Sequence, residues 1–575
     1  MRGRLFICVR ACCLFRKPAR TRAKESFMSS FFLQDHTLGQ MLDEAVRLCP
    51  DHDALLYVGR GYRQTWKEFA ETVDMLGRGL MALGVQPGEK IALWATNVPY
   101  WVAMLFAAAR IGAVLLAVNT NYRDSELERL IQQSECENFV CIDGFLDYDY
   151  VAALNRVVPD LKDQPAGDVH SVKFPRLRRV MSLKDIEHPG IIPLSGIFSR
   201  AGDTSQEEYE ARKALVHPGD VVNMQYTSGT TGFPKGVMLT HAGIVRNGFG
   251  IGERMSLCSG DRVVIPVPLF HCFGIVLGVM ACVSHCSAMI ILESFSPEKV
   301  MSSVQDEKAT VLYGVPSNFT AILGHRRFGQ YDFSSLRAIL MSGSVCPEPL
   351  MREVLSAMGV DEIYTPYGLT EASPVITMTR KGDSDEHRFK TVGCRLDGIE
   401  VELRDAQGLP VPAGVQGEIC CRGYNVMKGY YNMPEETAEV IDKDGWLKSG
   451  DLGVMDEEGY LRITGRIKDM IVRGGENIYP REVEEELLQM PGIADVQVVG
   501  IPSRRYGEDV AAFIIPKAGC VVQAGDVREF CRGRVAWHKI PRYIASVAEF
   551  PKTANGKIQK NRLRVMAEEL FPHVK

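Results

Sequence analysis

The sequence has no internal repeat and no low-complexity tract, and neither sign of charge dominates it. Its 66 Lys and Arg residues against 71 Asp and Glu residues give a formal net charge of −5, and 46% of the residues are hydrophobic. This composition excludes fibrous, collagen-like and wholly disordered proteins. At 575 residues, the chain is long enough to predict more than one domain.

The main body of the chain also lacks an excess of basic residues. The segment before Phe27 carries eight basic residues and one acidic residue, so removing its +7 from the total of −5 leaves −12 for the rest. A body of this charge is not suited to a polyanion such as DNA or RNA. We therefore expect no nucleic acid as a partner.

The sixteen cysteines lack the spacing of a small disulfide scaffold. Scattered thiols in a long chain favour a reducing compartment. We expect the cytoplasm, with peripheral membrane association or an organellar matrix as alternatives. The tightest cluster, Cys282-Val-Ser-His285-Cys286, has no second pair of ligands at a plausible spacing. It predicts buried thiols rather than half of a zinc site.

Two apolar segments need an interpretation before the fold is considered. Residues 1–27 are rich in Arg, and their apolar stretch is split by Arg10 without a clean cleavage site, which argues against a secretory signal. We interpret them as an extension outside the core, either a presequence or a region upstream of a start at Met28. Residues 98–118 are interrupted by Pro99, Arg110 and Gly112, and they predict a buried helix and strand rather than an integral membrane segment.

From about residue 65 the hydrophobic pattern alternates between helix and strand periods. Thr65-x-x-Glu68 is a capping box for a helix that runs toward Leu83, and the short apolar runs 91–95 and 139–142 are typical of buried strands. This alternation predicts an α/β fold with mixed, largely parallel sheets flanked by helices. The polar, weakly periodic residues 156–217 are expected to form an irregular surface connection.

Beyond Gly465 a compact run restarts the pattern, with a helix from Pro480 and strands at 496–501 and 510–515. Its length is that of a small separate domain. We therefore expect four parts: the extension 1–27, a large N-terminal domain 28–465, a boundary segment 466–470, and a small α+β C-terminal domain 471–575.

Residues 226–237, YTSGTTGFPKGV, form the most informative loop. Glycines let the backbone approach an anion, hydroxyl groups donate hydrogen bonds, and a lysine supplies a point charge. The loop therefore predicts a polyphosphate site, with Thr227, Ser228, Gly229, Thr230, Thr231, Gly232 and Lys235 as its candidate residues. It is not a Walker A loop, because Pro234 and Gly236 stand where that motif requires Gly and Ser or Thr. The simpler alternative is a flexible linker.

The loop resembles the signature of the acyl-adenylate-forming superfamily, which includes acyl-CoA synthetases, luciferases and the adenylation domains of peptide synthetases. The resemblance runs from about Leu38 to Leu563, and the later motifs follow in the expected order. GYNVMKGYY and IVRGGENIYPREVE are most similar to those of the medium- and long-chain fatty acyl-CoA synthetases.

In YGLTEAS (residues 367–373), the resemblance implies that Tyr367 flanks adenine, Thr370 contacts the α-phosphate and Glu371 binds the Mg²⁺ that accompanies ATP. A hard carboxylate oxygen suits that ion. Alone, Thr370-Glu371 would be typical of a helix start. Upstream, Ser342-Gly343-Ser344-Val345 is similar to the family's adenine-side loop, which makes Gly343 and Ser344 candidate contacts.

The motifs near the domain boundary are similar to the family's ribose, hinge and CoA segments. The resemblance implies that Asp451 of WLKSGD binds the ribose hydroxyls, that Arg466 contacts ribose or phosphate, and that Lys468 is the hinge. It also implies that the pantetheine arm of CoA lies along Gly474 and Gly475. Simpler alternatives are a solvated charge run around Arg466 and a tight turn at the two glycines.

Two further candidates are catalytic. The family carries its adenylation lysine where Lys557 stands in PKTANGKIQK, and a fixed ammonium there would stabilise the charge of the transition state. In the family, segments similar to 267–278 and 311–316 line the acyl tunnel, and His271 would lie near the carboxylate of the acid. An ordinary surface lysine and a packed histidine are the alternatives.

The resemblance implies an AMP-forming fatty acid:CoA ligase that uses ATP, Mg²⁺ and CoA. A carboxylic acid would react with ATP to give an acyl-adenylate, and the thiol of CoA would then displace AMP. Three alternatives stay open: a ligase for aryl or other acids, an enzyme that loads a carrier protein, and a catalytically silent nucleotide sensor. The sequence leaves open whether the protein is a monomer or a homodimer.

Overall fold

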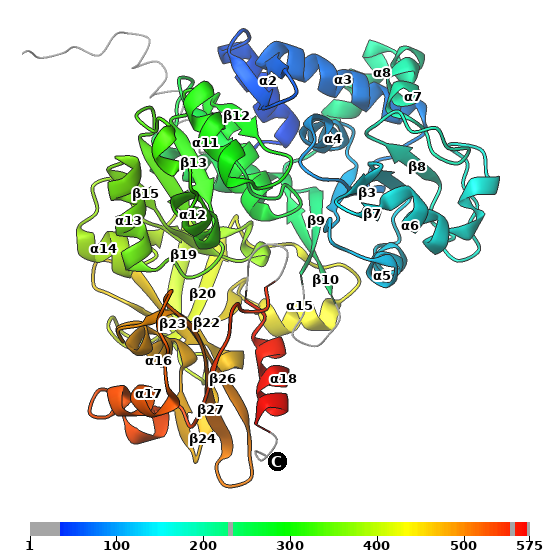
Figure 1. Ribbon diagram of the computed structural model, residues 1–575. Helices are drawn as coiled ribbons and strands as arrows, with labels where there is room; N and C mark the ends of the chain where they lie inside the picture. The colour runs from blue at the N-terminus through cyan, green and yellow to red at the C-terminus, as the bar shows by residue number, and fades with distance from the viewer. Residues whose placement is uncertain (1–34, 228–233, 553–557, 572–575) are drawn as a thin grey trace, which may run out of the picture.

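The computed structural model describes residues 35–227, 234–552 and 558–571. Two seven-stranded sheets form the centre of the N-terminal part (Figure 1). The first has the order β15-β14-β13-β11-β12-β1-β2, in which only the pair β1–β2 is antiparallel. In that order its strands span Glu362–Tyr364, Ala338–Met341, Val311–Gly314, Arg262–Ile265, Ala288–Ile291, Asp53–Tyr57 and Tyr62–Thr65.

The second sheet has the order β21-β10-β9-β4-β3-β5-β8. The five strands from β9 to β8 are parallel, whereas β10 and β21 are antiparallel to their neighbours. Its strands span Gly429–Tyr430, Lys235–Thr240, Val221–Thr227, Val114–Ala117, Lys90–Trp94, Asn138–Cys141 and Arg179–Ser182. The expected α/β fold with largely parallel sheets is confirmed.

Helices flank both sheets. The N-terminal part contains α2 Leu38–Leu48, α3 Trp66–Ala82, α4 Pro99–Arg110, α5 Asp124–Ser134, α6 Tyr150–Val157, α7 Leu194–Ser199, α8 Gln206–Ala214, α9 His241–Arg254, α10 Ala281–His285, α11 Pro297–Asp306, α12 Pro316–Leu323, α13 Glu348–Met358, α14 Asp385–Lys390 and α15 Pro434–Val440. The capping box of α3 is present, because Thr65 Oγ1 accepts from the Glu68 N–H and Glu68 Oε2 accepts from the Thr65 N–H.

The apolar segment 98–118 folds as predicted into a helix and a strand. α4 begins at Pro99 and is buried from Trp101 to Arg110, and Gly112, with φ +76°, turns the chain into the fully buried β4. Arg110 is buried with two carboxylate partners, Asp43 and Asp74. Among the helices that the structure describes, none has the length and hydrophobicity required to cross a bilayer.

The prediction of an irregular connection over residues 156–217 is wrong. This segment contains α7, α8 and β8, and β8 pairs in parallel with β5 as an edge strand of the second sheet. The strand is only four residues long, and its buried Val180 and Met181 follow a run of charged residues. Such a short apolar run carries too little periodicity to be recognised from the sequence.

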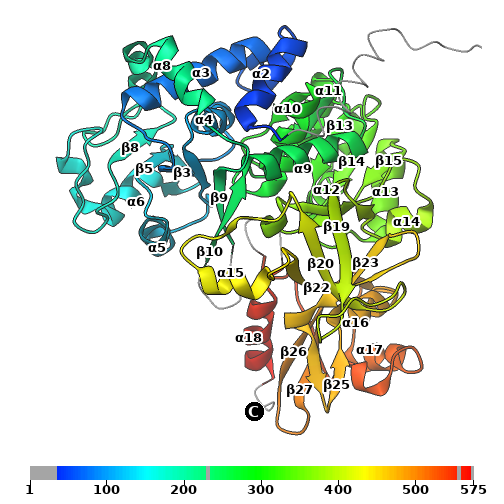
Figure 2. The ribbon, with the colours of Figure 1, turned by 180° about the vertical axis from the view of Figure 1, so that it is seen from behind.

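Below the two seven-stranded sheets in this view lies an antiparallel sheet of the order β19-β20-β22-β23, and below it the C-terminal part (Figure 2). Its strands span Ile399–Arg404, Gly417–Gly423, Leu447–Met455 and Leu461–Arg466. A small sheet of β16 Pro366–Gly368, β17 Val375–Met378 and β18 Cys394–Arg395 lies next to it in the chain.

The C-terminal part has its own sheet and its own apolar cores. The sheet is built from β24 Ile471–Arg473, β25 Glu476–Ile478, β26 Ile493–Ser503, β27 Gly507–Pro516 and β28 Tyr543–Ser546, with helices α16 Pro480–Leu487, α17 Ala524–Cys531 and α18 Lys560–Leu570. Residues of α16 and α17 pack in one apolar cluster and residues of α18 in another. This arrangement is what a separately folding α+β unit requires.

Candidate active site

The candidate phosphate loop connects β9 and β10 of the second sheet. β9 ends at Thr227, β10 begins at Lys235, and these two residues are direct antiparallel partners. The loop therefore starts and ends at the carboxyl end of β9, the edge where open α/β sheets bind ligands. Five candidate residues lie outside the described residues: Ser228, Gly229, Thr230, Thr231 and Gly232.

Tyr430 joins two of the candidate residues that lie far apart in the sequence. The Lys235 Nζ lies 4.8 Å from the centroid of its ring, and its hydroxyl donates a 2.8 Å hydrogen bond to Glu371 Oε1. Burial and the Glu371 carboxylate together raise the pKa of Tyr430 above its ordinary value, so the phenol stays a neutral donor. Lys235 and the half-buried Glu371 carboxylate thus both contact Tyr430, the first at its ring and the second at its hydroxyl. This pair suits a phosphate and its divalent cation.

The turn that carries Glu371 is short and well anchored. Thr370 and Glu371 lie in the 3₁₀ turn Thr370–Ala372, and the Glu371 carbonyl accepts from the Met427 N–H at 2.8 Å. In the contacts described, Tyr430 binds Oε1 of Glu371. A carboxylate oxygen is the hard donor that Mg²⁺ prefers. The residues present therefore fit this ion.

A second cluster is centred on Asp451, which is only 4% exposed. Tyr367 Oη donates to its Oδ2 at 2.9 Å, and Arg466 Nε donates to its Oδ1 at 2.5 Å. The register of β22 with β23 places Asp451 directly opposite Arg466. Burial, and secondarily Asp451, raises the pKa of Tyr367, whereas Asp451 itself raises the pKa of Arg466. Three candidate residues from separate motifs are thus brought together.

The candidate adenine-side loop, residues 342–345, follows β14 and is tied to the strand that carries Tyr367. Ser342 Oγ donates to the Pro366 carbonyl at 3.2 Å, one residue before Tyr367. Gly343 has φ +91°, and a Cβ there would lie 2.9 Å from Val315 Cγ1, so this position requires glycine. Ser344 is exposed beside it.

The loop before Phe273 carries His271. Asn97 holds this loop, because its side-chain N–H groups donate to the carbonyls of Val267 at 2.8 Å and Leu292 at 3.0 Å. The Asn97 side-chain oxygen in turn accepts from the Leu269 N–H at 2.8 Å. The His271 ring packs against Phe270 at 4.4 Å between centroids. Asn97 was missed in the sequence analysis, because nothing in its local pattern indicates so distant a partner.

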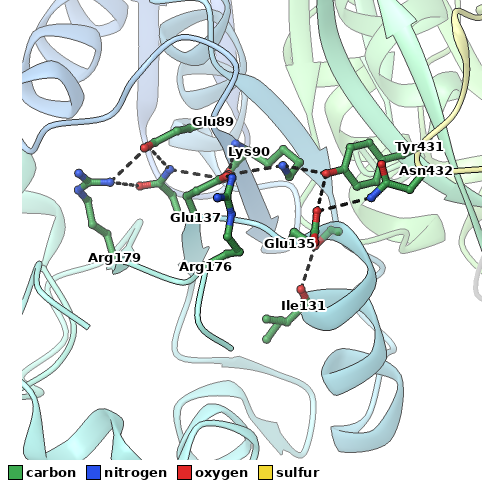
Figure 3. A network of polar contacts seen from close by, with 11 residues as sticks. Glu89, Lys90, Ile131, Glu135, Glu137, Arg176, Arg179, Tyr431 and Asn432 are labelled. Atoms are coloured by element: carbon green, nitrogen blue, oxygen red, sulfur yellow. Dashed lines mark hydrogen bonds and ion pairs between the residues drawn. The ribbon is translucent and has the colours of Figure 1, made fainter. Parts of the chain in front are cut away.

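Tyr431 anchors the segment that carries Tyr430 (Figure 3). Its hydroxyl donates to Glu135 Oε2 at 2.9 Å and accepts from Lys90 Nζ at 3.4 Å. Lys90 is buried and lies 3.6 Å from the equally buried Glu137. This network ties Tyr431 and Asn432 to Glu135, directly after α5, and Tyr431 to Lys90, the first residue of β3, and so it anchors the chain next to Tyr430. Neither tyrosine was singled out from the sequence.

The two candidate CoA-binding glycines form the turn between β24 and β25. Gly474 has φ +62° and Gly475 φ +90°, and the Gly474 N–H donates to the Tyr506 carbonyl at 2.8 Å. A Cβ at Gly475 would have no heavy atom within 4 Å, so the turn is open on that side. Near it, the Arg473 guanidinium lies 5.3 Å from the Tyr506 ring and 5.9 Å from the ring of Trp537.

The candidate hinge and the candidate catalytic lysine belong to the C-terminal half of the chain. Lys468 lies in the 3₁₀ turn Ile467–Asp469 between β23 and β24, and Asp469 pairs with Arg564 of α18 at 3.1 Å. Lys557 lies outside the described residues. The candidate site thus has three parts. Lys235 and Glu371 contact Tyr430, Tyr367 and Arg466 contact the buried Asp451, and Gly474 and Gly475 form a separate turn.

A glycine- and hydroxyl-rich sequence between β9 and β10, together with the half-buried Glu371 and the buried Asp451, is typical of a nucleotide-binding enzyme. Residues 42–431 match the model of the AMP-binding enzyme family, and residues 482–557 match that of the AMP-binding enzyme C-terminal domain. The chain belongs to the AMP-binding enzyme family.

Similar proteins cover nearly the whole chain. YngI of Bacillus subtilis (strain 168), named provisionally as an acyl-CoA synthetase, is 46% identical over 93% of this chain and 98% of its own. The mitochondrial medium-chain acyl-CoA ligase ACSF2 of Danio rerio is 36% identical over 96% and 92%. Among solved structures, ATP-bound MatB from Rhodopseudomonas palustris matches with a TM-score of 0.79 at 26% identity, covering 93% and 99%. The anthranilate CoA ligase AuaEII with anthranoyl-AMP matches with 0.80 at 25%, covering 94% and 98%.

Proposed function

We propose that the protein is an AMP-forming acid:CoA ligase that activates a medium- or long-chain fatty acid. The observation that best supports this proposal is that Lys235 and Glu371 both contact Tyr430, as a phosphate-binding cation and a carboxylate ligand of Mg²⁺ would in such an enzyme. The names of YngI and ACSF2 support an acyl-CoA product.

In the first step, a carboxylate oxygen of the acid attacks the α-phosphorus of ATP and pyrophosphate leaves. Lys235 and Thr370 bind phosphate oxygens, and Asp451 accepts hydrogen bonds from the ribose hydroxyls between Tyr367 and Arg466. Gly343 and Ser344 lie along adenine. Glu371 would hold the Mg²⁺ that accompanies ATP, and the ion would neutralise phosphate charge there. Lys557 stabilises the negative charge that develops in the transition state.

In the second step, the sulfur of CoA attacks the carbonyl carbon of the acyl-adenylate, AMP leaves, and the thiol proton is released. The pantetheine arm lies along Gly474 and Gly475, where the backbone turn is open. Since Lys557 and this turn belong to the same C-terminal unit, a rotation at Lys468 exchanges one for the other at the reacting centre. The separate sheet and cores of that unit support such a rotation.

The apolar surroundings of His271 support a fatty acid. The helix Phe273–Met280, which follows His271, is buried from Gly274 onward, and we propose that residues 267–278 and 311–316 line the acyl tunnel. Each methylene buried there contributes about 0.8 kcal/mol, so binding improves with each carbon until the tunnel is full. His271 then lies near the carboxylate.

We infer the cellular compartment of the protein from the state of its cysteine thiols. Cysteines of the described part of the chain such as Cys136, Cys141, Cys272 and Cys282 are free thiols, which favours a reducing compartment. We place the enzyme in the cytoplasm, and fractionation of cells that express the full chain tests this.

The deciding experiment is a CoA-thioester assay across straight-chain acids from C2 to C18, with benzoate and anthranilate included. We expect stoichiometric AMP and pyrophosphate and the highest kcat/KM with medium or long chains. A preference for the aromatic acids would replace the fatty acid with an aryl acid, the substrate class of AuaEII. A carrier protein outcompeting free CoA would identify a loading enzyme, and absence of pyrophosphate with every acid would leave a nucleotide sensor.

A further inference from the structure

Gln225 connects the strand of the phosphate loop to the loop of His271. It lies on β9, two residues before Thr227, and is 3% exposed. Its Oε1 accepts two hydrogen bonds from Cys272, one from the N–H at 3.1 Å and one from the thiol at 3.2 Å. A single buried amide oxygen thus holds both the backbone and the side chain of the residue that follows His271.

The other end of the Gln225 amide is held as well. Its Nε2 donates to Asn223 Oδ1 at 2.9 Å, and Asn223 Nδ2 donates to the Leu115 carbonyl on β4 at 2.9 Å. Both side chains are on one face of β9, because alternate residues of a strand point the same way. Each amide therefore has partners for its oxygen and its nitrogen, and neither can rotate without leaving a buried polar atom unpaired.

Cys272 also lies near the turn of Glu371. Burial, and after it the nearby Glu371 carboxylate, raises the pKa of the Cys272 thiol to about 12. The thiol therefore stays protonated near neutral pH and serves as a hydrogen-bonding link rather than as a nucleophile.

We propose that Gln225 is a positioning residue for acyl-adenylate formation. Through Cys272 it sets the position of the His271 loop relative to the phosphate loop of β9 and the Thr370–Glu371 turn. The acid and the α-phosphate must meet in line, and a displacement of about 1 Å costs roughly 10²-fold in rate. Two parallel strands at the centre of a sheet supply a rigid reference that a loop alone does not. This inference rests on the proposed ligase activity.

The test uses substitutions that separate the hydrogen bonds from the packing. Gln225→Met keeps the length and bulk of the side chain but removes the hydrogen bonds at both ends of the Gln225 amide. Cys272→Ala removes only the thiol, whereas Cys272→Ser keeps a donor and an acceptor there. Cys282→Ala is the matched control, because Cys282 is an equally buried thiol on α10 in the same apolar core.

The readout is ATP–pyrophosphate exchange with the best fatty acid, together with the melting temperature. We expect Gln225→Met to lower kcat by roughly 10- to 10²-fold while KM for ATP changes less than about threefold. Cys272→Ala should lower kcat in the same direction, and Cys272→Ser should recover most of it. Should Gln225→Met fail to fold, the Cys272 pair decides the question.

Three outcomes would overturn the positioning role: an unchanged kcat in Gln225→Met, an equal loss in Cys272→Ser and Cys272→Ala, or an equal loss in Cys282→Ala. The unsubstituted protein separates this failure from a failure of the proposed function. If it exchanges pyrophosphate with no acid at all, the ligase activity itself is refuted.

Discussion

The hydroxyl of Tyr430 donates a 2.8 Å hydrogen bond to Oε1 of Glu371. Tyr430→Phe removes this bond and keeps the ring beneath Lys235. Because partners of a metal ligand typically contribute 10- to 100-fold to metal affinity, we expect the Mg²⁺ concentration for half-maximal activity to rise about tenfold. Titration of Mg²⁺ at fixed ATP measures this.

The matched control for that experiment is Tyr431→Phe. Its hydroxyl binds Glu135 instead of Glu371, so the loss of a phenol and of an anchoring bond is comparable. An equal shift of the Mg²⁺ curve in both variants would mean that Tyr430 acts only by anchoring the segment.

We expect the Asp451 carboxylate to make the enzyme prefer ATP, which has a ribose, over 2′-deoxy-ATP. Asp451→Asn weakens hydrogen bonds that involve a charged acceptor, which contribute about 1.5–3 kcal/mol each. We expect wild-type protein to favour ATP over 2′-deoxy-ATP by at least about tenfold in KM and the variant to lose most of that preference. A variant that discriminates as well as wild type would place the ribose elsewhere.

Lys557→Ala separates the two half-reactions. Removing one preorganised charge costs roughly 10²–10³ in rate, so acyl-adenylate formation should fall by that amount. Thioester synthesis from supplied acyl-adenylate should stay largely intact, because the proposed rotation moves Lys557 away. Both rates are measured on one preparation, and an equal loss in both would refute the division of labour.

Trp537 offers an exposed aromatic face near the glycine turn. It is 67% exposed, beside Arg473, which also lies against Tyr506. Stacking of a base on an aromatic side chain contributes about 1–3 kcal/mol. We expect the adenine base of CoA to stack on Trp537, so Trp537→Ala should raise KM for CoA about tenfold. Pyrophosphate exchange, which needs no CoA, should not change; a loss of exchange would show that Trp537 acts on folding.

Local patterns predicted the elements whose signal is local. The capping box of Thr65 and Glu68 and the interrupted apolar run 98–118 both fold as their residues indicate. β8 was missed because its four residues pair with a strand some forty positions earlier. Tyr430 and Gln225 were missed for the same reason, since their partners Glu371 and Cys272 are distant in sequence.

Asp261 predicts how acid weakens the first sheet. Burial would raise the pKa of this carboxyl, but hydrogen bonds from Arg337 and Thr310 outweigh it and hold the pKa below its ordinary value. The stabilisation is therefore complete above the unfolded-state pKa near 3.9 and is lost as pH falls through the lower folded-state pKa. Asp261→Asn, which leaves Arg337 without its carboxylate partner, should lower stability by about 2 kcal/mol at pH 7. Melting curves at pH 7 and pH 3 measure this. The difference in melting temperature between variant and wild type should be smaller at pH 3 than at pH 7. An equal difference at both pH values would assign the loss of stability to packing.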